Sequence, residues 1–124
     1  MDAEAIRDIF LALGPVHIRK MFGGQGVYQG ELMFALEANG ELYLKVSEDT
    51  AEIFRGLGSR PFTYVSRDGR TTTMSYWLMP ESALDDQDEA LELARLALQA
   101  ARHAKATAAR KGKRASAPPV TSSS

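Results

Sequence analysis

The stretch from Arg19 to Tyr28 restricts the fold of this chain most, because it combines two cations, three glycines and several large apolar side chains. Glycine inside a strand or helix costs about 0.5–1 kcal/mol relative to alanine. Glycines at positions 23, 24 and 26 therefore indicate a backbone path that other residues cannot follow. The alternating residues on both sides favour strands, so the stretch is predicted to be a forced bend between two antiparallel strands.

The same stretch allows a second interpretation, as a site for a phosphate or another small molecule. Backbone N–H groups of Gly23, Gly24 and Gly26 could cradle an anion, and Arg19 and Lys20 would supply positive charge. A phosphate loop normally connects a strand to the start of a helix, whereas this one connects two strands. A structural bend is therefore the favoured interpretation, and a bulge or close backbone crossing would explain the glycines.

Apolar spacing and turn signals predict an α+β fold in the order α-β-β-β(-β)-α-β-β-α. Helices would pack on an antiparallel sheet of five to six strands. Asn39-Gly40 and Asp68-Gly69 each separate two alternating segments and are strong hairpin signals. Strands are expected at residues 16–22, from 27, and at 32–38, 42–46, 61–65 and 71–78. Helices are expected from residue 3, between residues 47 and 58, and from 90 to about 103.

A broad stripe of Leu and Ala side chains lies on the last predicted helix. Such a stripe predicts burial against a sheet or against another subunit, so a homodimer is one expectation. Hydrophobic content of 44% in 124 residues suffices for one core, which predicts a single domain over residues 1–104. Residues 105–124 are basic and rich in Ala, Ser and Pro, and we expect them to form a disordered tail.

Charge is divided unevenly along the chain. Residues 1–101 carry a net charge of −7, whereas residues 102–114 carry +6. The cations of this basic segment are Arg102, Lys105, Arg110, Lys111, Lys113 and Arg114. Such a segment either contacts nucleic acid phosphates or serves only solubility, and both interpretations stay open.

Metal and catalytic sites are not expected. The chain has no cysteine, and its two histidines, His17 and His103, stand far apart without matching acidic residues. Ser75 lies in a predicted strand and lacks the turn that exposes a hydrolase nucleophile. The acidic residues from Asp85 to Glu89 could bind a cation, but capping of the following helix explains them as well. We therefore expect no catalytic residue, no metal and no cofactor.

Five aromatic residues of the predicted strands allow two interpretations. Tyr28, Tyr43, Tyr64, Tyr76 and Trp77 could form a platform for bases or a partner, or could simply pack. Packing is the favoured interpretation. No apolar run approaches the roughly 20 residues of a membrane span, and the chain begins with acidic residues, so a cytoplasmic protein without membrane contact is expected.

Several separated blocks resemble the TfoX/Sxy N-terminal domain family of bacterial competence regulators. The blocks are residues 19–24 with Gly26, 33–36, 40–46, 61–64, 74–78 with 80–81, and 84–86, and the resemblance covers about residues 3–101. It implies a cytoplasmic, non-enzymatic domain of regulators that promote competence-gene transcription together with a cyclic-AMP-responsive activator. Those regulators also carry a second, helical C-terminal domain, whereas only the basic segment follows the last predicted helix here.

Three hypotheses on function follow from these observations. The leading one is a small regulatory or adaptor domain that contacts proteins, such as the transcription machinery or an activator. The second is nucleic acid binding through the basic segment. The third is an enzyme or small-molecule binder that uses the glycine bend with Arg19 and Lys20.

Overall fold

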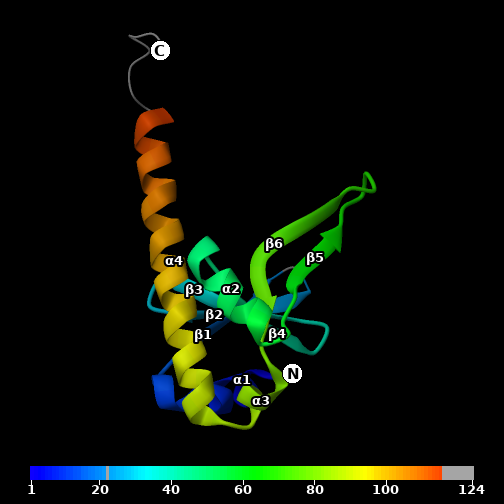
Figure 1. The fold of residues 1–124 in the computed structure, drawn as a ribbon, viewed down its shortest axis with the longest axis vertical. Coiled ribbons are helices and arrows are strands. Elements are labelled where there is room, and N and C mark those ends of the chain that lie inside the picture. Colours follow the sequence, from blue (N-terminus) through cyan, green and yellow to red (C-terminus); the bar gives the residue numbers. More distant parts are fainter. Residues whose placement is uncertain (22, 116–124) are drawn as a thin grey trace.

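A computed structural model describes residues 1–21 and 23–115, with side chains described through residue 108. Its elements confirm the predicted α+β class and the order of helices and strands (Figure 1). They are α1 (Ala3–Ile9), the 3₁₀ helix η1 (Leu11–Leu13), β1 (His17–Met21), β2 (Gly24–Gln29), β3 (Leu32–Ala38), β4 (Glu41–Lys45), α2 (Glu48–Gly56), β5 (Pro61–Val65), β6 (Thr71–Leu78), α3 (Glu81–Leu84) and α4 (Gln87–Ala115).

The six strands form one antiparallel sheet in the order β1-β2-β3-β4-β6-β5. The predicted Asn39-Gly40 hairpin connects β3 to β4, and both residues have the positive φ that a type I′ turn requires, 54° and 82°. The Glu37 carboxylate accepts a hydrogen bond of 2.8 Å from the Gly40 N–H and so holds the turn closed. The predicted turn at Gly69, with φ of 84°, connects β5 to β6.

The glycine stretch differs from the predicted bend, because β2 already begins at Gly24 and not at Val27. Gly23 takes the positive φ, 77°, of the tight turn, while Gly24 and Gly26 lie inside the strand as partners of Met21 and Arg19. A Cβ on Gly24 would overlap the backbone carbonyl oxygen of Glu37. The close backbone crossing that the sequence already suggested as an explanation therefore accounts for Gly24.

A β-bulge in β3 allows two consecutive residues to point into the core. Val27 is paired with Ala35 and Tyr28 with Met33, so Phe34 is an extra residue on the β3 side. Phe34 and Ala35 are both fully buried. Without the extra residue, the alternation of a regular strand would turn one of them to the opposite face.

All the helices pack on one face of the sheet and share a single core with it. Phe10, which follows α1, packs edge to face against Phe34 with ring centroids 5.1 Å apart. Each α-helix contributes at least one buried apolar residue to this core, namely Ile6, Phe54, Ala83, Ala94 and Leu98. The Leu and Ala stripe of α4 is therefore covered by the domain's own sheet. The homodimer that this stripe also suggested stays a prediction.

Helix α4 extends to Ala115, well past the predicted end near His103. Alanine, lysine and arginine dominate the additional turns and are strong helix formers, so local propensity continues the helix without a core beneath it. Figure 1 shows this end of α4 standing beyond the sheet. The domain boundary at residue 104 stays a prediction, and the rest of the predicted tail, residues 116–124, lies outside the described residues.

Candidate protein-binding face of the sheet

The face of the sheet opposite the helices carries the candidate site. Side chains of directly paired residues lie on the same face of a sheet. Arg19, Gly26, Leu36 and Tyr43 are such partners on β1, β2, β3 and β4. The neighbouring row contains Ile18, Val27, Ala35 and Leu44 and faces the helices. We call the side with Leu36 the open face, because the buried helix residues all belong to the core on the other side.

A groove of about 420 Å³ lies on the open face near the end of β3. Its lining is mostly apolar and comprises Met21, Gly24, Gln25, Met33, Leu36, Glu37, Ala38, Phe62, Tyr64 and Met74. Phe62, Tyr64 and Met74 belong to the β5–β6 hairpin, which projects from the body of the domain (Figure 1). Gln25 and Glu37 direct their side chains to the other face of the sheet, where Gln25 Nε2 donates to Glu37 Oε1 at 2.9 Å.

The glycines of β2 have a structural role at this groove. A Cβ on Gly26 would lie 2.8 Å from the Sδ atom of Met21 and 3.1 Å from that of Met33. The two thioethers therefore occupy the space that a side chain at position 26 would need. Gly24 is part of the groove lining and lies against the β3 backbone. Together the glycines let the methionine side chains lie across the strand.

The cations proposed for a phosphate site are not brought together. Arg19 and Lys20 are consecutive residues of β1, so their side chains point to opposite faces of the sheet. Lys20, Gly23 and Gly24 do line a depression of about 700 Å³, but Asp2 and Glu37 line it too. The N–H groups of Gly24 and Gly26 belong to a strand paired on both sides. The phosphate interpretation gains no support from this arrangement.

Two cations on the open face lie over aromatic rings. The guanidinium carbon of Arg19 is 5.2 Å from the centre of the Tyr28 ring, and Lys45 Nζ is 5.0 Å from that of Tyr76. Lys45 Nζ also donates to Ser75 Oγ at 2.7 Å. Burial lowers the pKa of Lys45. The ion pairs found within the described side chains include neither Arg19 nor Lys45, so both charges lack a carboxylate there.

The tyrosines mostly pack, as predicted for the aromatic residues. Tyr43 and Tyr76 are buried, and the Tyr43 ring meets that of Phe62 at a centroid distance of 4.8 Å. Burial raises the pKa of Tyr76 to about 12. Tyr64 is the exception, with 46% of its surface exposed beside the groove. Trp77 packs against the core on the helix side, so the five aromatic residues do not form one platform.

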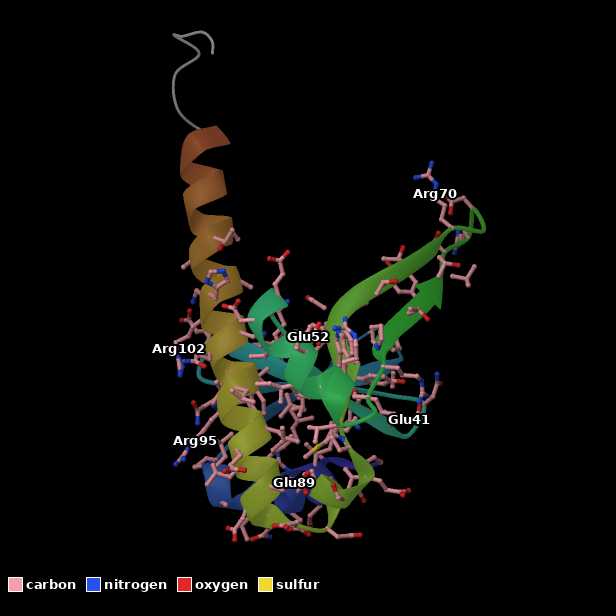
Figure 2. All side chains as sticks on the ribbon, in the orientation of Figure 1. Glu41, Glu52, Arg70, Glu89, Arg95 and Arg102 are labelled. Carbon is pink, nitrogen blue, oxygen red and sulfur yellow. The ribbon has the colours of Figure 1, made fainter. Side chains whose placement is uncertain are left out.

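The basic segment lies on the outer part of α4. Arg102 is exposed there (Figure 2). Lys105 Nζ lies 3.2 Å from Glu31 Oε1 in an exposed ion pair. The side chains of the other predicted contacts, Arg110, Lys111, Lys113 and Arg114, lie outside the described residues. Nucleic acid contact through this segment stays a prediction.

The remaining candidates of the sequence have local structural roles. Asp86 Oδ1 accepts hydrogen bonds from the N–H groups of Asp88 and Glu89 at 3.0 and 3.2 Å, which is the predicted cap of the last helix. Among the described residues, no cluster of three or more His, Asp or Glu side chains is arranged to hold a metal ion. Within the same part of the chain, no helix has the length and apolar character needed to cross a membrane.

The fold and the open face together define a two-layer α+β domain, with helices on one side of the sheet and an apolar groove on the other. Residues 8–101 match the TfoX N-terminal domain, and the chain belongs to this family. Protein Sxy of Escherichia coli (strain K12) is 29% identical over 101 residues, which cover 82% of this chain and 48% of Sxy.

A second relative is DNA transformation protein TfoX1 of Aliivibrio fischeri (strain ATCC 700601 / ES114). It is 32% identical over 90 residues, which cover 68% of this chain and 43% of the relative. The chain thus spans about half the length of the curated relatives it matches. These comparisons confirm the family that the sequence blocks indicated.

Proposed function

We propose that this chain is a non-enzymatic regulatory domain that acts in the cytoplasm by binding another protein. The observation that carries the proposal is the apolar groove on the open face. Contiguous apolar surface on a soluble protein often marks a binding site. The groove offers thioethers and aromatic rings in place of paired acids, bases or nucleophiles, which suits recognition better than catalysis.

Family membership supports a role in regulation. The name of one relative, DNA transformation protein TfoX1, suggests control of DNA uptake as the process in which this chain takes part. We propose the transcription machinery, or an activator that works with it, as the protein that the domain contacts. Because the chain matches only about half of each relative, this process and this partner belong to the proposal.

Crosslinking in the native host tests the proposal. The tagged full chain is expected to form a specific crosslink to a protein, and the Leu36→Glu variant is expected to lose it, because a carboxylate would enter the apolar groove. Ile53→Glu is the matched control, since Ile53 is an exposed residue of α2 outside the groove. Circular dichroism shows whether both variants fold. Absence of any crosslinked protein with the wild-type chain would refute the proposal.

The length of α4 favours a second candidate function, nucleic acid binding. The helix continues to Ala115, which places the basic segment on a rod beyond the sheet (Figure 1). Contacts to phosphates would make the affinity fall steeply with salt, by a slope of roughly 0.9 per neutralised phosphate. We expect Arg102→Glu with Lys105→Glu to weaken retention of DNA on a low-salt gel. Unchanged retention would exclude the described part of this segment as a contact.

A further inference from the structure

We propose that the groove on the open face binds an acidic amphipathic helix of the partner protein. The inference deepens the proposed function and rests on it, because it names the surface and the chemistry of the protein contact. The groove is defined here by Met21, Met33, Leu36, Phe62 and Met74. Three observations support a helix of this kind.

The first observation is that the backbone beneath the groove is already paired. Leu36 lies on β3, which is paired with β2 on one side and with β4 on the other. The N–H and C=O groups of its ladder positions are therefore used within the sheet. A binding segment cannot join as a further strand at this place and must contribute side chains alone. A helix that lays one apolar face into a groove is a binding mode that does so.

The second observation concerns the methionines of the groove. Their side chains are unbranched and polarisable, and such side chains adapt to the apolar surface of a partner. Met21 and Met33 place their sulfur atoms over Gly26, beside the ring of Tyr28, in space that a side chain at position 26 would fill. Met74 lines the side formed by the β5–β6 hairpin. A volume of about 420 Å³ limits the occupant to the few anchor side chains that one helix face presents.

The third observation is the charge around the groove. Arg19 and Lys45 belong to the open face and lack a carboxylate partner among the described side chains. Other cations of the strands do not add to this charge, because Lys20 points to the helix side and Arg60 and Arg70 pair with carboxylates. Residues 1–15, 48–58 and 80–101, which contain α1, α2, α3 and the inner part of α4, hold twelve acids and three cations, whereas the outer part of α4 holds the six cations of the basic segment. An occupant with carboxylates beside its apolar face therefore complements Arg19 and Lys45 on the open face.

The same observations disfavour single-stranded nucleic acid as the occupant. Base stacking needs exposed aromatic faces. Tyr43 and Tyr76 are buried, and the rings of Tyr28 and Tyr76 already lie under the cations of Arg19 and Lys45. Only Tyr64 offers a largely exposed ring beside the groove. The lining is thus apolar and adaptable rather than a stacking platform.

Methyl NMR of the full chain, labelled with ¹³C at the methionine methyl groups, tests this inference. The ligand is a synthetic helical peptide with leucine on one face and glutamate on the other. We expect the resonances of Met21, Met33 and Met74 to shift, while Met79, which is 3% exposed in the core, does not. A peptide with lysine in place of every glutamate is the matched control and should bind about tenfold more weakly at low salt.

Charge reversal in the protein completes the test. Arg19→Glu combined with Lys45→Glu should weaken binding of the glutamate peptide and strengthen binding of the lysine peptide. The inference is overturned if Met21, Met33 and Met74 do not respond to the glutamate peptide, if both peptides bind equally, or if a thymidine oligonucleotide shifts the same resonances instead.

Crosslinking tests the proposed function separately from the groove. A host protein that still crosslinks to the folded Leu36→Glu variant would overturn the groove assignment and leave the proposed function intact. Absence of any protein crosslink with the wild-type chain would refute the proposed function itself.

Discussion

Replacing Gly24 by alanine tests the structural reason for the glycines of β2. The added Cβ would overlap the backbone carbonyl oxygen of Glu37 on the neighbouring strand. A backbone atom cannot rotate away as a side chain does, so β2 and β3 have to separate locally. That separation strains the pairing that holds Gln25 opposite Glu37.

The expected magnitude follows from two opposing contributions. Overpacking of a crowded site costs about 1–3 kcal/mol. Alanine also lowers the chain entropy of the unfolded state, which recovers about 0.5–1 kcal/mol relative to glycine. We therefore expect Gly24→Ala to lower the free energy of unfolding by about 1–2 kcal/mol. Gly26→Ala should cost less, because the atoms in its way are mainly the mobile sulfurs of Met21 and Met33.

Gly56→Ala is the matched control for this series. Gly56 ends α2, has no positive φ, and a Cβ there would meet no heavy atom within 4 Å. Alanine should stabilise the fold by about 0.5–1 kcal/mol at this position. Urea unfolding followed by the fluorescence of Trp77, the single tryptophan, measures all three variants. If Gly24→Ala were as stable as the wild type, close strand approach would not be the reason for the glycine.

Three further predictions follow from the packing and the hydrogen bonds. Phe34→Ala should lower the free energy of unfolding by about 3–5 kcal/mol, because Phe34 is fully buried at the bulge. A loss below about 1 kcal/mol in urea unfolding would contradict that burial. Thr50→Ala should cost about 1 kcal/mol in the same assay, since its hydroxyl accepts from the Ser47 N–H at 2.9 Å in the capping box; an unchanged midpoint would mean that this cap does not contribute. The pKa of Tyr76 is raised to about 12 in the folded state, whereas in the unfolded chain the hydroxyl loses its proton from about pH 10 upwards. The contribution of Tyr76 to the free energy of unfolding is therefore complete below about pH 10 and falls between about pH 10 and 12. Tyrosinate absorbance should show a tyrosine with a pKa of about 12 that Tyr76→Phe lacks, beside Tyr43, whose pKa burial also raises. An identical titration curve for the variant would speak against the assignment.

Local signals in the sequence predicted the elements whose chemistry is local. Asn39-Gly40 forms the expected hairpin turn, and Asp2 caps α1 by accepting from the Ala5 N–H. Ser47 caps α2 with Thr50 as its reciprocal partner. In each case the deciding hydrogen bonds lie within three residues of each other.

Features that depend on distant contacts were not predictable in the same way. The crowding at Gly24 depends on the approach of Glu37 from β3, and the bulge at Phe34 depends on the pairing of β2 with β3. That the side chains of Arg19 and Lys20 point to opposite faces of the sheet could have been predicted from the alternation of a strand. The groove could not be predicted from strand alternation, because Met74 reaches it only through the pairing of β4 with β6.

Helix α4 gives the molecule a lever arm. Its 29 residues correspond to about 43 Å at 1.5 Å per residue, and its inner turns are anchored on β3. Ala35 and Leu36 are neighbours on that strand, one beneath the helix and the other in the groove, so a single layer of backbone separates the two surfaces. Force from a molecule bound to the outer turns of α4 is therefore transmitted to β3, the strand that forms the base of the groove.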